Sequence, residues 1–113
     1  MITVPVELGE RSYPVIVGSG ARHELGAALA PTTRRVAFVT QANIPFHYEP
    51  PSSAVEASVN VIGDGEPAKT LETVGKLCES FADSGLNRAD AVVGVGGGVV
   101  TDVAGFAASV YYR

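Results

Sequence analysis

The start of the chain alternates apolar and polar residues. Residues 2–8 place Ile, Val, Val and Leu at every second position, which predicts a strand with one face on a core. Pro5 makes this an edge strand or the beginning of one. Residues 13–17 form a second extended run after the turn-like residues 9–12, so a β-hairpin is predicted over residues 1–17. A short helix is expected over residues 21–29, closed by Pro31.

Three further short apolar runs predict strands, at residues 36–39, 58–62 and 91–95, and the first and last are expected to be buried in a parallel sheet. After Thr70, a suitable N-cap, apolar residues recur at helical spacing, and Gly85 stands where a C-terminal glycine belongs. The apolar stripe of that helix comprises Leu71, Val74, Leu77, Cys78 and Phe81. These elements predict an α/β fold, Rossmann-like, with a parallel or mixed sheet of roughly five or six strands, flanking helices and the N-terminal hairpin.

The run at residues 91–95 leads into Gly96, Gly97 and Gly98 and then into a second helical pattern, whose apolar stripe is Val99, Val103, Phe106, Ala107 and Val110. Three glycines let the backbone take positive φ and let another molecule approach its N–H groups. Unpaired N–H groups and the helix dipole converge at such a turn, which suits phosphate. The turn is neither a G-x-G-x-x-G fingerprint nor a Walker loop. The pattern alone therefore leaves two interpretations, a nucleotide or phosphate site and a purely structural turn.

Composition narrows the class of protein. With 113 residues, 46% of them hydrophobic, the chain can form one domain with a core. A net charge of −4 offers no basic surface for nucleic acid or an anionic membrane. No apolar run approaches the roughly 20 residues of a membrane-spanning helix, and the first residues lack signal-peptide features, so a cytoplasmic location is expected.

The residue types that bind metals are sparse. Cys78 is the single cysteine, so it can form neither an internal disulfide nor a metal site alone, and it is expected to be buried in the core. His23 and His47 have no second ligand at suitable spacing. His47 lies in residues 44–57, where three prolines prevent a long helix. No metal ligand is therefore predicted in residues 1–113.

Three segments carry a resemblance to a known family. They are residues 13–20 (Tyr-Pro-Val-Ile-Val-Gly-Ser-Gly), residues 64–69 (Asp-Gly-Glu-Pro-Ala-Lys) and residues 96–113, which begin Gly-Gly-Gly-Val-Val-Thr-Asp and end Tyr-Tyr-Arg. In order and spacing they resemble segments of the 3-dehydroquinate synthases, which are sugar phosphate cyclases. The resemblance implies that residues 1–113 are an N-terminal NAD-binding domain. Complete members are more than twice as long and carry a C-terminal helical metal-binding domain, so the chain is expected to be an incomplete piece.

The resemblance also implies cofactor contacts outside the glycine turn. Glu66 and Lys69 match the cofactor-contacting pair of the family, and Asp64 lies in the same turn. Taken alone, these residues are better explained as solvated turn charges than as ligand contacts. Asn43 matches the second position of an Asp-x-Asn contact that follows the strand at residues 36–39, whereas Gln41 stands where the acid would be.

In the last segment the expected cofactor contacts are Gly97, Gly98, Val99, Val100 and Thr101. Asp102 is expected to engage ribose hydroxyls, although an acid in the first turn of a helix also complements the helix dipole. Arg113 resembles a family arginine that helps to hold the substrate, and its planar fork suits a carboxylate or a phosphate.

The reaction implied by the resemblance converts 3-deoxy-D-arabino-heptulosonate 7-phosphate to 3-dehydroquinate and phosphate in the shikimate pathway. It uses NAD and a divalent metal, zinc or cobalt, whose Glu and two His ligands would lie outside this chain. The chain alone is therefore expected to be inactive, and its parent to be a homodimer. Three alternatives stay open: another cyclase such as a 2-epi-5-epi-valiolone synthase, a glycerol-dehydrogenase-like oxidoreductase, and a nucleotide-binding module without catalysis.

Overall fold

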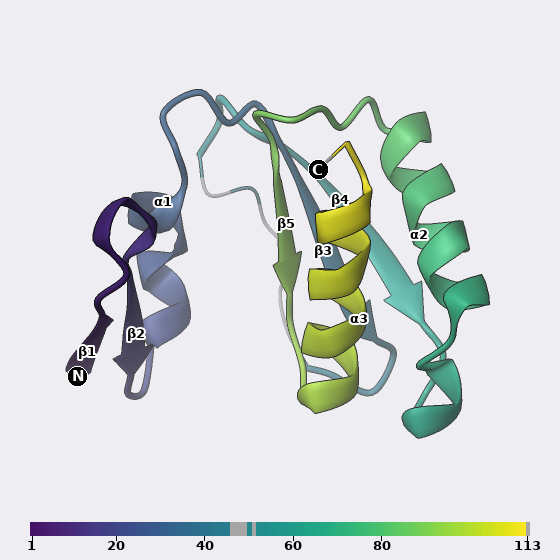
Figure 1. Ribbon diagram of the computed structural model, residues 1–113, viewed down its shortest axis with the longest axis horizontal. Helices are drawn as coiled ribbons and strands as arrows, with labels where there is room; N and C mark the ends of the chain where they lie inside the picture. Colours follow the sequence, from purple (N-terminus) through teal and green to yellow (C-terminus); the bar gives the residue numbers. More distant parts are fainter. Residues whose placement is uncertain (46–49, 51, 113) are drawn as a thin grey trace.

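The computed structural model describes residues 1–45, 50 and 52–112, and its main sheet has three parallel strands in the order β4-β3-β5 (Figure 1). β3 (Arg35–Gln41) lies in the middle and pairs with β4 (Glu56–Ile62) along its whole length. On its other side, residues 36–39 of β3 pair with β5 (Ala91–Gly94). The α/β prediction is confirmed. The described residues contain five strands, but two of them form a separate sheet.

The separate sheet is the predicted hairpin. β1 (Ile2–Val6) pairs antiparallel with β2 (Tyr13–Val17), and the short helix η1 (Gly9–Arg11) connects them. The expectation that one face of this hairpin is buried on a core is wrong for the described residues, since the facing side chains Val4 and Val15 are 49% and 42% exposed. The two strands pair only with each other, beside η2 (Ala21–Glu24) and α1 (Leu25–Ala28) and away from the main sheet (Figure 1). These two helices fill the range predicted for a short helix.

The core lies between the main sheet and two helices. Ala37 and Val39 of β3 are fully buried in one cluster with residues of α2 (Leu71–Asp83) and α3 (Gly98–Val110). Val36 and Phe38, which alternate with them and point to the opposite face, are each 1% exposed. The central strand is therefore buried on both faces, as its apolar sequence predicted.

α2 begins and ends where the sequence predicted. The Thr70 hydroxyl accepts a hydrogen bond from the Thr73 backbone N–H at 3.1 Å, and Gly85 takes a φ of +80° after the helix. Within the predicted apolar stripe, Leu77 and Phe81 are buried, whereas Leu71 is 78% exposed. Cys78 is only half-buried, although this burial raises the pKa of its thiol. The prediction of a buried stripe is thus wrong at the first turn of the helix.

The buried face of α3 is shifted from the predicted one. Val103 and Ala107 are buried as predicted, together with Val100 and Ala104, whereas Phe106 and Val110 are each 50% exposed. The reason is a close approach of α3 to β5, because a Cβ built on Gly94 would lie 3.2 Å from the Ala104 Cβ. Only small residues allow this contact, so the helix turns its alanines toward the sheet and leaves Phe106 at the border.

The carboxylate of Asp90 connects the amino ends of β5 and β3. Asp90, just before β5, accepts hydrogen bonds at 3.0 Å from the backbone N–H groups of Arg34, Arg35 and Asn87. Partial burial by itself raises the pKa of Asp90, but these hydrogen bonds and the Arg35 charge outweigh it, so the pKa lies below that of an ordinary aspartate. This contact fixes β5 beside β3.

The remaining chain differs little from expectation. β4 begins at Glu56, two residues before the predicted start at Ser58, because the Glu56 backbone N–H donates to the Arg34 carbonyl at 2.9 Å and extends the pairing with β3. His47 lies outside the described residues. Among the helices of the described ranges, none is long and apolar enough to cross a membrane.

Candidate functional site

The carboxyl ends of all three parallel strands meet at one edge of the sheet (Figure 1). Two side-chain hydrogen bonds tie the segments that leave this edge: Thr40 Oγ1 donates to the Val95 carbonyl at 2.8 Å, and Gln41 Nε2 donates to the Gly63 carbonyl at 2.9 Å. Gln41, which the resemblance left without a role, thus connects the ends of β3 and β4. Ligands of open α/β sheets bind outside the carboxyl ends of the strands, so this edge is the candidate site.

The predicted site residues follow these strand ends. Asn43 lies exposed in the turn after β3, and the exposed residues Asp64, Glu66 and Lys69 follow β4 around η3 (Glu66–Ala68). The glycine turn and the first turn of α3 follow β5. Arg113, the predicted substrate contact, lies outside the described residues. The fold therefore brings the three predicted segments to one edge, while the individual cofactor contacts stay predictions.

The three glycines of the turn differ in what the fold demands of them. Gly96 has a φ of +153°, and a Cβ there would lie 2.8 Å from Val100 Cγ2, so packing inside the protein excludes a side chain. Gly97 has a φ of −81°, and a Cβ on Gly97 or Gly98 would meet nothing within 4 Å. Positive φ is thus confined to Gly96. Gly97 and Gly98 leave an open surface that a ligand can approach.

The N-terminus of α3 adjoins this open surface. Gly97 occupies the N-cap position and has no side chain to accept from the first backbone N–H groups of the helix, which therefore remain available to an acceptor from outside. The Thr101 hydroxyl lies 3.3 Å and 3.2 Å from the Gly97 and Gly98 carbonyls, to which it donates. Val99 is half-buried and the Val100 side chain is fully buried, so Val100 can offer a ligand only its backbone.

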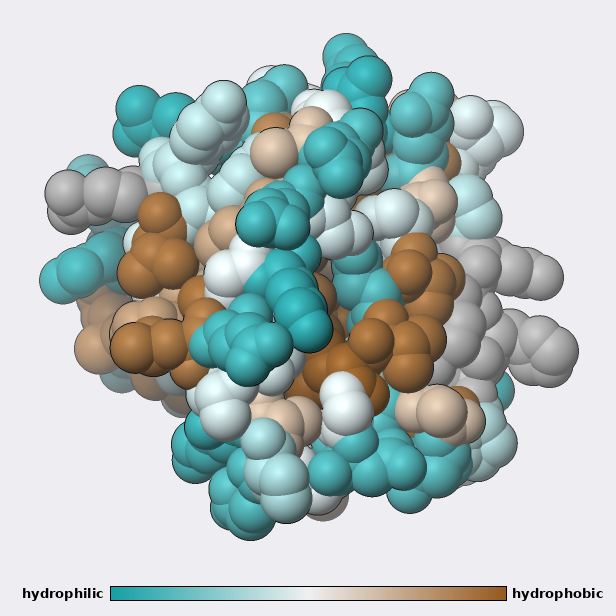
Figure 2. Space-filling model, turned by 90° about the vertical axis from the view of Figure 1, so that its right-hand side faces the viewer, coloured by the Kyte–Doolittle hydropathy of each residue, from teal (hydrophilic) through white to brown (hydrophobic). Residues whose placement is uncertain are grey.

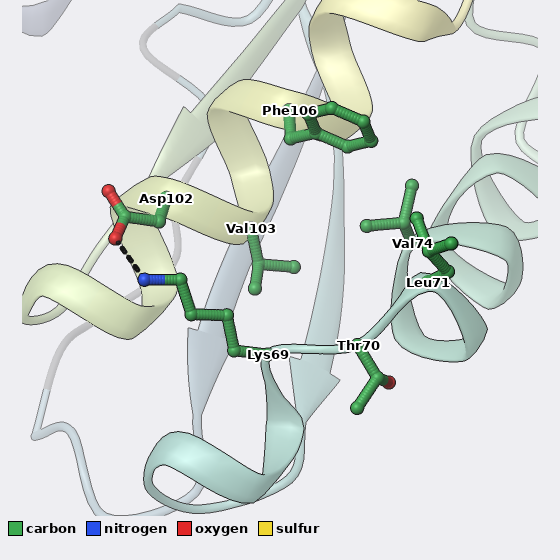
Figure 3. Close-up of a pocket in the computed structure, with 7 residues that line it drawn as sticks. All are labelled: Lys69, Thr70, Leu71, Val74, Asp102, Val103 and Phe106. Carbon is green, nitrogen blue, oxygen red and sulfur yellow. Dashed lines mark hydrogen bonds and ion pairs between the residues drawn. The ribbon is translucent and has the colours of Figure 1, made fainter.

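An ion pair links the segment after β4 to the segment after β5. Lys69 Nζ and Asp102 Oδ2 are 2.8 Å apart, and the two side chains are 49% and 57% exposed (Figure 3). The hydrogen bond to Asp102 and the negative charges of Asp102 and Glu66 raise the pKa of Lys69 above its ordinary value. The ammonium is therefore fully charged at neutral pH.

A pocket of about 470 Å³ opens beside this ion pair, between α2 and α3. Figure 3 shows Lys69 and Asp102 on one side of the pocket and Val103, Phe106, Leu71 and Val74 around the rest. Seen from the side of α2, apolar residues lie exposed on either side of a polar strip (Figure 2). Sequence reasoning did not assign these apolar residues to a site because Leu71, Val74 and Phe106 fit the buried stripes of their helices.

Within the described residues, no group of three His, Cys, Asp or Glu side chains is placed to hold a metal ion. The anion-binding features of the edge are instead one lysine, backbone N–H groups and an open glycine surface. Beside them stand the carboxylates of Glu66 and Asp102, which can accept from hydroxyl groups. This combination fits a ligand that carries both phosphate and sugar hydroxyls.

Comparisons with known proteins agree with this geometry. Residues 59–113 match the family model described as 3-dehydroquinate synthase N-terminal. The whole chain is 41% identical over 121 aligned residues to the 3-dehydroquinate synthase of Pelotomaculum thermopropionicum, of which it covers 33%. It is 46% identical over 111 residues to a protein of Amycolatopsis mediterranei (strain S699) named as a candidate aminodehydroquinate synthase, of which it covers 31%. The chain thus spans about a third of the length of the curated relatives it matches.

A solved structure has the same fold. A crystal structure of 2-deoxy-scyllo-inosose synthase, complexed with carbaglucose-6-phosphate, NAD⁺ and Co²⁺, superposes with a TM-score of 0.82 at 26% identity over 99% of this chain and 33% of that one. The resemblance recognised in the three sequence segments is confirmed. The chain is similar to the N-terminal part of the 3-dehydroquinate synthases.

Proposed function

We propose that the chain is the NAD-binding part of a 3-dehydroquinate synthase, a carbon–oxygen lyase that acts on a sugar-acid phosphate. The observation that carries the proposal is the convergence of the glycine turn and the Lys69–Asp102 pair at the carboxyl edge of the sheet. Similarity to the Pelotomaculum enzyme supports the choice of reaction. Similarity to a synthase solved with NAD⁺ supports the choice of cofactor.

In this proposal each segment of the edge has one task. The backbone N–H groups after Gly97 and Gly98 hold the pyrophosphate, since nothing in the described protein fills the space beside them. Asp102 and Glu66 accept hydrogen bonds from ribose hydroxyls, and Lys69 provides the positive charge. Asn43 and Asp64 extend the contact surface at the ends of β3 and β4. Arg113 is assigned to the substrate.

When bound, NAD supplies a transient oxidation of the substrate that is reversed later in the reaction. The residues of this chain bind and orient that cofactor, and we assign no general acid or base among them. The described residues contain no group of side chains that fits the divalent metal expected for the family, and we propose that its ligands lie outside this chain. A cytoplasmic location and a homodimer, with no nucleic acid or membrane partner, complete the proposal.

One observation favours a second candidate. The Amycolatopsis relative, at 46% identity, is named for an amino-substituted product. The cofactor site would be the same in both enzymes, because relatives of both kinds match nearly the whole of this chain. The distinction would lie in the residues that contact the substrate.

The test uses the full-length gene product that contains this chain. Phosphate release from 3-deoxy-D-arabino-heptulosonate 7-phosphate is measured before and after bound NAD is removed, with zinc or cobalt present. We expect release that stops without NAD and returns on its addition. Turnover only of the amino-substituted analogue favours the second candidate, and NAD-independent release refutes the proposed role of this chain.

A further inference from the structure

We propose that the Lys69–Asp102 ion pair makes the site prefer ligands that present an anion and hydroxyl donors side by side, and that it weakens the binding of simple phosphates. The proposal rests on the proposed function and concerns the selectivity of the same site. In this arrangement Asp102 stays paired with Lys69 until a ligand offers an anion to the ammonium and a hydrogen-bond donor to the carboxylate.

The geometry allows a ligand to reach both members of the pair. Lys69 comes from the turn after β4 and Asp102 from the first turn of α3, so the ion pair joins two different segments of the edge. Both side chains are about half exposed at a separation of 2.8 Å. They are also the only charged residues among the seven that line the pocket between α2 and α3. The other five lining residues carry no charge. If the ion pair opens, the ligand therefore has to supply the new partners of the ammonium and the carboxylate within this pocket.

An inorganic phosphate satisfies only one of the two groups. If the phosphate takes the Lys69 ammonium, the Asp102 carboxylate loses its partner and stays close to the new anion. Two like unit charges about 4 Å apart in water repel by an energy that corresponds to about a fivefold loss of affinity. The raised pKa of Lys69 agrees with an ammonium that already has a negatively charged partner, to which Glu66 adds.

A nucleotide satisfies both groups. A carboxylate only accepts hydrogen bonds, and ribose hydroxyls donate them, so a ribose beside Asp102 replaces the bond from Lys69. The ammonium is then released toward the ligand phosphate. Asp102 lies four positions after Gly98, which is about 6 Å along the helix axis. A phosphate at the open glycine surface therefore places its own ribose within reach of Asp102.

The test compares NAD with inorganic pyrophosphate by isothermal titration calorimetry on the full-length gene product. We expect Asp102→Asn to bind pyrophosphate about fivefold tighter, because the competing charge is gone, and to bind NAD at least tenfold weaker. Lys69→Met is expected to weaken both ligands. In the Lys69→Met background, Asp102→Asn is expected to improve pyrophosphate binding by less, because no ammonium draws the phosphate to within about 4 Å of Asp102.

Glu72→Gln provides the matched control. It removes the same charge from an exposed ion pair with Lys76 on α2, 3.3 Å long, and is expected to change neither affinity. Circular dichroism checks that each variant is folded, and Asp102→Ser replaces Asp102→Asn if the latter is not.

The outcomes separate this inference from the proposed function. If the unchanged protein binds NAD but Asp102→Asn binds pyrophosphate no more tightly, the ion pair does not weaken the binding of simple phosphates and the inference is overturned. The same holds if Asp102→Asn improves pyrophosphate binding equally in the presence and in the absence of Lys69. If the unchanged protein does not bind NAD, the proposed function fails and the inference fails with it.

Discussion

Replacing Gly96 and Gly97 separately by alanine distinguishes the structural glycine of the turn from the ligand-facing one. The two residues are adjacent and receive the same methyl group. At Gly96, φ is +153° and the added Cβ would lie 2.8 Å from Val100 Cγ2 and 3.1 Å from Val100 Cβ. At Gly97, φ is −81° and the added Cβ would meet no atom within 4 Å.

The expected loss of stability follows from these contacts. An alanine held at a positive φ outside the usual regions costs about 1–3 kcal/mol. The clash adds about 1–3 kcal/mol, because the Val100 side chain is β-branched, fully buried and unable to rotate away. Gly96→Ala should therefore lower the free energy of unfolding by about 2–6 kcal/mol. Gly97→Ala should change it by less than about 1 kcal/mol, since the poorer N-cap is offset by a less flexible unfolded chain.

Urea unfolding followed by circular dichroism measures the first effect, and titration with NAD measures the second. We expect Gly96→Ala to unfold at much lower urea concentration. We expect Gly97→Ala to unfold like the unchanged protein but to bind NAD at least tenfold more weakly, because the methyl group occupies the open surface. An NAD affinity unchanged by Gly97→Ala would refute the assignment of this surface to the cofactor. Equal destabilisation by both variants would refute the steric argument.

Three further outcomes are expected. Thr70→Ala should destabilise the protein by about 1 kcal/mol in urea unfolding, while Thr70→Ser should not, because the hydroxyl caps α2 through the Thr73 N–H; equal stabilities would contradict this role. The pKa of Asp90 is lower in the folded than in the unfolded protein, so its stabilisation is complete above the ordinary aspartate pKa of about 3.9 and is lost as the pH falls through the lower folded value. Asp90→Asn should accordingly show a weaker dependence of stability on pH between about pH 5 and 2, and an unaltered dependence would exclude Asp90 as its source. NAD should bind more tightly than NADP, since Glu66 and Asp102 repel an additional phosphate; titration with both nucleotides decides this, and a preference for NADP would count against these contacts.

Local patterns predicted the elements of this protein better than their burial. Thr70 and Gly85 mark the two ends of α2, and they could be recognised because helix caps act within a few residues. The hairpin over residues 1–17 was predicted from the alternation of apolar and polar residues and from a turn. Which face of a helix is buried depends instead on distant partners. Helical spacing alone predicted that Phe106 is buried. In the structure Ala104 packs closely against Gly94, so the small residues of α3 face the sheet and Phe106 stays half exposed.

The candidate site shows the same division. The glycine turn and the Glu66–Lys69 segment were recognisable because their residue types carry the chemistry. The Lys69–Asp102 ion pair joins residues 33 positions apart, and no local pattern could show that they meet. Likewise, sequence could not tell Gly96 from Gly97, because the difference lies in the position of the Val100 side chain.

The strand order has a consequence for how the protein is made on the ribosome. β3 is the central strand, yet its neighbour β5 begins about 50 residues after β3 ends. At a synthesis rate of about 5–20 residues per second, the β5 side of β3 stays unpaired for about 3–10 s. During that interval a strand with Ala37, Phe38 and Val39 at its centre presents free backbone groups to any other extended chain. Folding during synthesis therefore passes through a stage in which the β5 edge of β3 is open to pairing with the wrong strand.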